Sequence, residues 1–215
     1  IYAFDEGNKA MKDLLGGKGA NLAEMKRLGL PVPDGFTLTT KACIEYLKQG
    51  AHLSDELVGQ LHEQLEAFSQ RTQKSFSSKE SLLLVSVRSG AKISMPGMMD
   101  TILNLGLNDF NVKTLAEKTD DARFAYDCYR RLLQMFGEVV YGIPMTSFDT
   151  YFNQYKAQHN YQNDADIPAE GLEEICDHFK SVYLEEVYKP FPQEPIVQLT
   201  EAIEAVFKSW DNDRA

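Results

Sequence analysis

The sequence predicts an α+β protein in which a part that mixes helices and strands is followed by a mostly helical part. Two observations lead to this prediction. Runs rich in apolar and β-branched residues occur before residue 107, and beyond it the apolar residues recur at helical spacing. With 215 residues, 43% of them hydrophobic and 25% charged, the chain is long enough for one large globular domain or two small ones.

Three helices are expected in the first part. The stretch GKGANLAEMKRLG predicts a helix that stops at Gly29, and KACIEYLKQG predicts a short one that stops at Gly50. Residues 54–70 predict a third helix, with Ser54 as its N-cap. The residues expected on the buried stripe of the first helix are Leu22, Met25 and Leu28.

Three extended segments accompany these helices. VPDGFTLTT predicts a turn followed by a short extended run. SLLLVSVRS is so apolar and β-branched that we expect a central strand, buried on both faces. TILNLGL is expected to be the next strand of the same sheet.

The second part is predicted to be helical. Its periodicity indicates a long helix up to Gly142, two further helices and, after the rigid FPQEP connector, a final helix with Pro195 in its first turn. This last helix is expected to return the chain to the first part. The predicted division is therefore an α/β lobe, residues 1–107 plus 194–215, and a helical insert subdomain, residues 108–193.

The formal net charge is −10, and the two parts of the chain differ in it. Residues 1–107 carry 12 basic and 12 acidic side chains, so the excess of negative charge lies in the second part. We expect no nucleic-acid partner, because phosphate backbones require basic surfaces. The first part is where an anionic ligand would meet little repulsion.

The sequence also predicts a compartment. No apolar run of about 18 residues occurs, so no membrane span is expected. The first residues, IYAFDEGNK, are acidic and predict no secretion signal. Cys43, Cys128 and Cys176 are odd in number, far apart and outside any CxxC motif. They predict reduced thiols, packed as small hydrophobic side chains in a cytoplasmic protein.

Two short stretches are candidates for binding phosphate. Gly16, Gly17 and Gly19 surround Lys18 just before a helix. Glycines let backbone N–H groups approach a ligand, and a helix N-terminus and a lysine add positive charge. A plain turn is the alternative. Arg88, at the end of a strand, is either a surface cap or a cation that binds phosphate oxygens in a bidentate manner.

The third candidate is the loop SMPGMMD between the two strands. Met98 and Met99 could fill a gap in the core, because methionine is flexible and apolar. Alternatively, Lys92–Met99 forms a lid whose amides, at Gly97, Met98 and Met99, face a nucleotide. Asp100 is either a metal ligand or a turn residue. The histidines and the other acidic residues lack the spacing of a metal cage, so no metal ligand is expected in this chain.

Together these stretches resemble a known family. LLGGKGANLAEMKRLGLPVPDGFTLTT and LLLVSVRSGAKISMPGMMDTILNLGLND are similar to the N-terminal nucleotide-binding domain of the pyruvate, phosphate dikinases, and SMPGMMDT is the most specific piece. The resemblance continues through RFAYDCYRRLLQMFG and FPQEPIVQLTEAIEAVFKSWDNDRA. It implies the first lobe of an ATP-grasp fold that binds Mg-ATP. Lys18 and Arg88 match ATP-site residues, and Gly97, Met98 and Met99 match a loop over the phosphates.

The resemblance implies a phosphotransferase that converts ATP, phosphate and pyruvate into AMP, pyrophosphate and phosphoenolpyruvate. Its other domains, a second ATP-grasp half, a phosphohistidine domain and a pyruvate-binding barrel, are expected as partners, and the intact enzyme as a homodimer. The catalytic histidine has no counterpart in the 215 residues, so we expect an inactive fragment. Two alternatives remain open. One is the N-terminal domain of phosphoenolpyruvate synthase or another dikinase, and the other is a non-catalytic protein-binding module.

Overall fold

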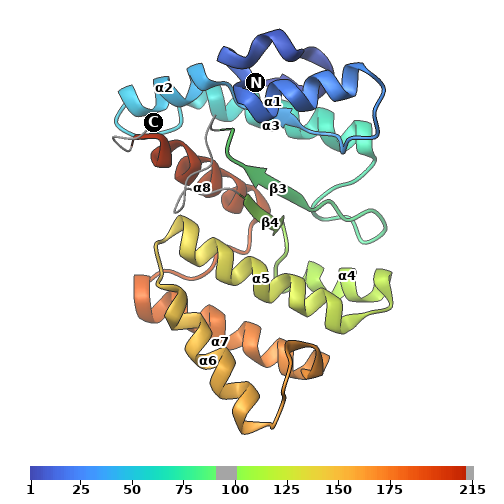
Figure 1. The fold of residues 1–215 in the computed structure, drawn as a ribbon, viewed down its shortest axis with the longest axis vertical. Coiled ribbons are helices and arrows are strands. Elements are labelled where there is room, and N and C mark those ends of the chain that lie inside the picture. The colour runs from blue at the N-terminus through green and yellow to red at the C-terminus, as the bar shows by residue number, and fades with distance from the viewer. Residues whose placement is uncertain (91–100, 212–215) are drawn as a thin grey trace. The chain divides into compact units, whose positions relative to one another are not determined.

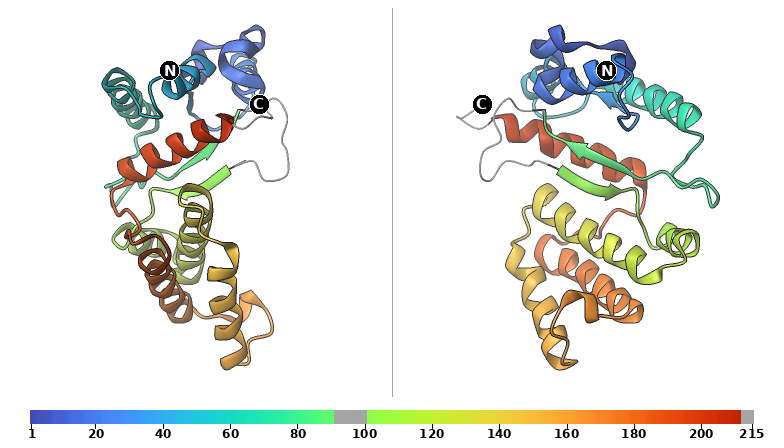
Figure 2. Two further views of the ribbon diagram at one scale, coloured as in Figure 1. Left: turned by 90° about the vertical axis from the view of Figure 1, so that its left-hand side faces the viewer. Right: turned by 45° about the vertical axis from the view of Figure 1, so that its right-hand side comes forward.

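The computed structural model describes residues 1–90 and 101–211, and its ribbon is shown in Figures 1 and 2. The chain forms two compact units. Unit 1 comprises residues 1–74, 88–101 and 203–215, and unit 2 comprises residues 75–87 and 102–202. These units are groups of residues in mutual contact. The division into a nucleotide-binding lobe and an insert, which is a division by role, stays a prediction.

Unit 1 is built mainly from helices and contains one short antiparallel pair of strands. Strand β1 pairs antiparallel with β2, with Tyr2 opposite Thr37 and Ala3 opposite Phe36. The elements in order are β1 (Tyr2–Ala3), the 3₁₀ helices η1 (Phe4–Glu6) and η2 (Lys9–Met11), α1 (Lys12–Arg27), β2 (Phe36–Thr37), α2 (Thr40–Lys48) and α3 (Asp55–Thr72). The end of a later helix, α8, completes this unit.

The predicted helix ends of unit 1 are confirmed. Gly29 and Gly50, which follow α1 and α2, have φ values of +73° and +79°, where glycine is favoured. The Ser54 hydroxyl accepts a hydrogen bond from the N–H of Leu57 at 3.2 Å, as an N-cap does. The two glycines and the N-cap serine therefore predicted these helix boundaries correctly.

The predicted buried stripe of α1 is wrong. Met25 is 39% exposed and Leu28 62% exposed, and Leu22 is only half-buried. Apart from Leu15, the buried face consists of small residues instead: Gly16, Gly19, Ala20 and Ala23. The reason is close approach, because a Cβ on Gly19 would lie 2.9 Å from Thr37 Cγ2. Large side chains on this face would hold the helix and strand β2 apart.

The two later strands share one sheet, as predicted. Strands β3 (Val85–Arg88) and β4 (Thr101–Leu105) form a two-stranded sheet within the described residues. The expectation that β3 is buried on both faces is wrong, since its two valines are half-buried and Ser86 and Arg88 are exposed. This alternation is typical of a strand with one covered face. The buried residues of that run, Leu83 and Ser89, lie just before and just after the strand.

Unit 2 is helical apart from this sheet. Its helices are α4 (Asn111–Thr119), α5 (Ala122–Val140), α6 (Met145–Gln158), η3 (Asp164–Asp166), α7 (Ala169–Val187) and the first half of α8 (Pro195–Lys208). Every residue from 120 to 190 is described and none lies in a strand, which confirms the helical prediction. Helix α5 lies alongside α7 and packs on α4 (Figure 1). None of the helices among the described residues is long and apolar enough to cross a membrane.

Aromatic rings fill the centre of unit 2. Phe148 and Phe179 meet with ring centroids 4.9 Å apart, and Phe136 meets Phe191 at 5.4 Å, both in edge-to-face geometry. Phe136, Phe148 and Phe179 are fully buried. Phe191 comes from the connector after α7, so the predicted rigid FPQEP segment is anchored by its first residue in the helical core.

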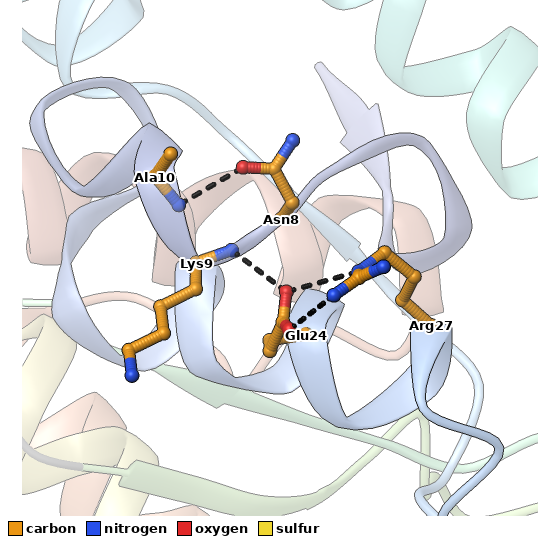
Figure 3. A pocket seen from close by; sticks show the side chains of 5 residues that line it. All are labelled: Asn8, Lys9, Ala10, Glu24 and Arg27. Atoms are coloured by element: carbon orange, nitrogen blue, oxygen red, sulfur yellow. Dashed lines mark hydrogen bonds and ion pairs between the residues drawn. The ribbon is translucent and has the colours of Figure 1, made fainter.

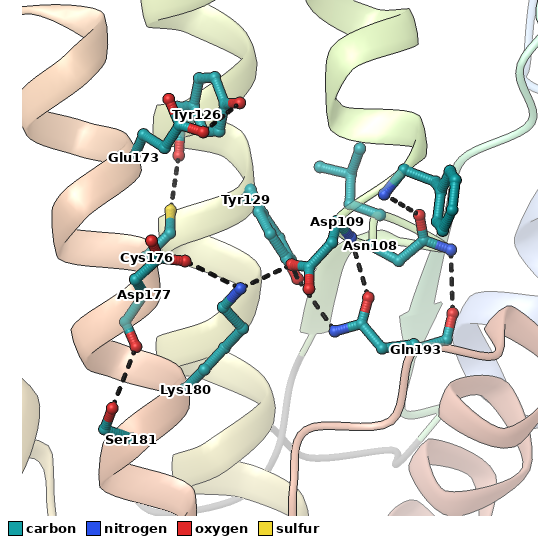
Figure 4. A network of polar contacts seen from close by, with 12 residues as sticks. Asn108, Asp109, Tyr126, Tyr129, Glu173, Cys176, Asp177, Lys180, Ser181 and Gln193 are labelled. Carbon is teal, nitrogen blue, oxygen red and sulfur yellow. Dashed lines mark hydrogen bonds and ion pairs between the residues drawn. The ribbon is translucent and has the colours of Figure 1, made fainter.

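A polar network fixes the same connector to the loop after β4 (Figure 4). Asp109 accepts hydrogen bonds from the Tyr129 hydroxyl at 2.7 Å and from Lys180 Nζ at 2.8 Å. The Gln193 side chain accepts from the backbone N–H of Asp109 at 2.9 Å and donates to the Tyr129 hydroxyl at 3.3 Å. Burial raises the pKa of Tyr129, so its hydroxyl remains a donor at neutral pH. The network therefore joins the loop after β4 to the connector that precedes α8.

The three cysteines are free thiols, and two of them are packed as predicted. Cys43 and Cys176 are buried and Cys128 is partly buried. Burial raises the pKa of the Cys43 thiol to about 11. These thiols are therefore protonated at neutral pH and behave as small apolar side chains.

Candidate functional site

The candidate site begins with a break inside α1. Gly16 has φ +71° and ψ 172°, so the element consists of two helical pieces joined by one non-helical residue. Such a conformation is accessible almost only to glycine. A second helix N-terminus is thereby created at Gly17, in the middle of the apparent helix. The first N–H groups of the restarted helix have no regular i−4 partners, and this end carries partial positive charge.

The break lies directly against the segment that follows β3. A Cβ on Gly16 would lie only 2.7 Å from the carbonyl oxygen of Gly90, so the two backbones are in contact. A Cβ on Gly17 would meet no atom within 4 Å, so space is open beside the restarted helix. The sequence predicted two separate candidate stretches, one around Lys18 and one around Arg88. The structure brings these two stretches together.

Both predicted cations are at the surface of unit 1. Lys18 is exposed in the first turn after the break, and Arg88 is exposed at the end of β3. Each is close in sequence to one side of the Gly16–Gly90 contact, two residues away in both cases. Lysine, arginine and backbone amide donors are the groups that can neutralise an anion such as a phosphate group.

Neighbouring residues support the break from the other side. The Thr40 hydroxyl donates to the carbonyl oxygen of Asp13 at 2.6 Å, and Gly19 packs on Thr37. Thr39 caps α2 by accepting from the N–H of Ala42 at 3.1 Å. The segment 37–40 thus holds both pieces of α1 in place.

Trp210 and Ser89 were missed as site residues by the sequence reasoning. The indole Nε1 donates to the Ser89 hydroxyl at 3.4 Å, and Ser89 is 2% exposed. No local pattern in the sequence links Trp210 to Ser89, because 121 residues separate them. The remaining predicted residues, Gly97, Met98 and Met99, lie outside the described residues, as does the whole predicted lid, and their role stays a prediction.

A shallow depression elsewhere on unit 1 is not part of this site (Figure 3). It is lined by Asn8, Lys9, Ala10, Glu24 and Arg27. The Glu24 carboxylate accepts hydrogen bonds from the Arg27 guanidinium, the shortest at 2.6 Å, and from the N–H of Lys9 at 3.2 Å. These contacts, with the Arg27 hydrogen bond foremost, lower the pKa of Glu24 to about 2. The Glu24 carboxylate therefore already neutralises the Arg27 guanidinium in this depression.

The part of the chain that the structure describes contains no group of three or more His, Cys, Asp or Glu side chains placed to hold a metal ion. What the described site can do chemically is bind and orient an anionic group. Lys18 and Arg88 supply exposed positive charge, and the backbone offers donors.

Comparison with known proteins gives a family. Residues 12–58 and 49–215 match the family model for "Pyruvate phosphate dikinase, AMP/ATP-binding domain". Pyruvate, phosphate dikinase of Clostridium symbiosum is 50% identical over 216 residues, which cover 100% of this chain and 25% of that protein. The chloroplastic pyruvate, phosphate dikinase 1 of Arabidopsis thaliana is 51% identical over 210 residues, or 98% of this chain and 22% of that protein.

A third relative, pyruvate, phosphate dikinase of Rhizobium meliloti, is 47% identical over 219 residues, covering 100% of this chain and 24% of that protein. The chain thus spans about a quarter of the length of these relatives. The match covers both compact units, including α1 and the segment after β3. The chain belongs to the pyruvate phosphate dikinase AMP/ATP-binding domain family.

Proposed function

We propose that this chain is the ATP-binding part of a pyruvate, phosphate dikinase and that it binds the nucleotide phosphates at the Gly16 break. The observation that carries the proposal is the contact between Gly16 and Gly90, which places the Lys18 and Arg88 segments side by side. Lys18 and Arg88 supply the cations, and the amides of the restarted helix supply fixed donors.

The proposed reaction is the conversion of ATP, phosphate and pyruvate into AMP, pyrophosphate and phosphoenolpyruvate, with a phosphohistidine on another domain. In this scheme the chain is the first lobe of an ATP-grasp fold. Its task is to position and neutralise the phosphates, which is most of what a protein contributes to phosphoryl transfer. Mg²⁺ would enter with the nucleotide. The names of the relatives favour this reading over phosphoenolpyruvate synthase or a protein-binding module.

The same proposal includes the setting of the chain. The partners are ATP and the remaining domains of the same enzyme, because the relatives are about four times longer. We place the enzyme in the cytoplasm, where the three free thiols would stay reduced. We further propose that the intact enzyme is a homodimer, as the resemblance implies.

One lobe alone should bind ATP weakly. Hydrogen bonds to charged groups contribute about 1.5–3 kcal/mol each. Two or three of them barely exceed an association cost of about 4 kcal/mol or more. We therefore expect the 215-residue chain to bind Mg-ATP no tighter than the millimolar range and to show no turnover. Calorimetric titration tests this, and micromolar affinity would contradict it.

The role of the two cations is tested in the longer protein. We expect Lys18→Ala and Arg88→Ala each to slow ATP-dependent phosphorylation of the histidine domain at least tenfold, because a charged contact to phosphate is lost. The half-reaction that starts from phosphoenolpyruvate should keep its rate, since it uses other domains. Both rates are measured with radiolabelled phosphoryl donors.

A matched control is Lys48→Ala, which removes an exposed lysine in the last turn of α2. It should leave both half-reactions unchanged. If Lys18→Ala and Arg88→Ala slow both half-reactions together, the two residues support the fold rather than the nucleotide.

A further inference from the structure

The single tryptophan of the chain lies beside the candidate phosphate site. Helix α8 ends at Lys208 and continues as the 3₁₀ helix η4 (Ser209–Asp211), which carries Trp210. Its indole Nε1 donates to Ser89 Oγ at 3.4 Å across a sequence separation of 121 residues. Such a contact is made by tertiary folding alone.

Trp210 follows a helix end that is packed against α2. One turn earlier, Phe207 is 6% exposed, and its ring centroid lies 5.4 Å from that of Tyr46. The Cys43 thiol donates to the carbonyl oxygen of Phe207 at 3.8 Å. The end of α8 is therefore held against α2 within unit 1, and the indole has a defined place from which to donate.

Ser89 is the residue on which the geometry of the site depends. It stands between Arg88, which is exposed, and Gly90, whose carbonyl oxygen meets Gly16. In extended backbone, successive side chains point to opposite faces. Holding Ser89 inward therefore keeps Arg88 outward, and a slip of one residue would reverse the two.

We propose that Trp210 is a positioning residue for the phosphate site. Its indole N–H holds Ser89, and Ser89 in turn keeps Arg88 facing outward and Gly90 against the break at Gly16. The inference rests on the proposed function, because it assumes that phosphates bind where these segments meet. Trp210 itself does not touch the nucleotide. A ligand that moves Arg88 also moves the adjacent Ser89 and, through the hydrogen bond, the Trp210 indole. The indole therefore also reports whether the phosphate site is occupied.

The test uses the ¹⁵N-labelled 215-residue chain, whose spectrum contains one indole N–H resonance. The chain is titrated with millimolar Mg-ATP, pyrophosphate or adenosine. We expect the Trp210 indole to shift together with the amides of Gly17 and Gly19 on addition of ATP or pyrophosphate. Adenosine, which has no phosphate, should shift none of them.

Variants then separate positioning from general stability. Ser89→Ala removes the acceptor, and Trp210→Phe keeps a ring but removes the donor. Trp210→Phe should weaken ATP binding about three- to tenfold, the effect of losing one neutral hydrogen bond, and Ser89→Ala should weaken it at least as much. The double variant should bind no more weakly than the worse single variant, because both changes remove the same contact. Binding is followed on the Gly17 amide.

The control is Phe207→Leu, which loosens the same helix end without removing the indole. Its melting temperature should fall while its ATP affinity changes less than that of Trp210→Phe. If affinity instead follows melting temperature across all variants, the positioning role is overturned. If the Gly17 amide shifts while the indole stays still and Trp210→Phe binds normally, the inference fails and the proposed function survives. If neither resonance responds, the inference fails, and the proposed function is then decided by the half-reactions of Lys18→Ala and Arg88→Ala in the longer protein.

Discussion

Gly16 adopts a backbone conformation that a residue with a side chain rarely permits, and it does so against another backbone. Its neighbour Gly17 differs in both respects, since it lies in the restarted helix with open space around it. At the scale of single residues, the two halves of one Gly-Gly pair therefore have different tasks. The first makes the break, and the second leaves room beside it.

This difference predicts opposite effects of the same substitution. Gly16→Ala should lower the free energy of unfolding by about 2 kcal/mol or more, because it combines strain at positive φ with a clash against Gly90. Gly17→Ala should be neutral or stabilising by up to about 1 kcal/mol, as alanine for glycine in a helix is. Urea denaturation of both variants measures this. Equal effects would mean that the break is not at Gly16.

Gln198 shows how one side chain can satisfy several backbone groups. It is fully buried, and its Oε1 accepts from the N–H of Gly106 at 2.9 Å. Its Nε2 donates to the carbonyl oxygens of Leu107 at 2.9 Å and Pro192 at 2.8 Å. Within unit 2, Gln198 therefore links the residues that follow β4 to the connector that leads into α8.

At the scale of elements, the three hydrogen bonds of the Gln198 side chain predict a large loss of stability when this residue is replaced. Gln198→Leu leaves three backbone groups without this partner, two of them buried and the Pro192 carbonyl part-buried, and each buried one costs about 1–3 kcal/mol. We expect unfolding free energy to fall by about 3 kcal/mol or more in chemical denaturation. Thr200→Val, which removes a hydroxyl bonded to Ile196 within the same helix, should cost less than about 1 kcal/mol. A similar loss for both variants would show that the three hydrogen bonds of Gln198 do not contribute specially to stability.

Element-scale prediction from sequence worked where the pattern was local. Helices α5, α6, α7 and α8 were located by apolar periodicity, whereas α4 was not predicted. Leu172, Ile175 and Phe179 are buried in α7 as their spacing indicates. It failed on α1, where the usual preference for burying large apolar residues led to the wrong face. There the buried face is set by the closeness of β2, which only small residues allow.

At the scale of the whole molecule, buried thiols and phenols should make the fold sensitive to alkali. Burial raises the pKa of Cys43 to about 11 and that of Tyr46 and Tyr126 to about 12. Because the folded pKa exceeds the unfolded one, the protonated form stabilises the fold fully below about pH 8.5. This contribution is lost as pH rises toward 11 and 12.

We therefore expect the thermal midpoint to be insensitive to these groups up to about pH 8.5 and to fall by several degrees by pH 11. Circular dichroism at stepped pH measures it. Cys43→Ala removes one of the titrating groups, so its midpoint should fall less steeply over the same range. An equal slope for the variant would show that the thiol does not contribute.

The sequence by itself determined the α+β composition, the helix ends at Gly29, Gly50 and Ser54, and the family, because these depend on local backbone preferences and contiguous motifs. It also marked Lys18 and Arg88, but as separate signals. Only the tertiary structure decided that their segments meet at Gly16 and Gly90, that small residues form the buried face of α1, and that Trp210 holds Ser89. The physical reason is that these contacts join residues far apart in the chain through shape and backbone approach, which leave no periodic pattern in the sequence.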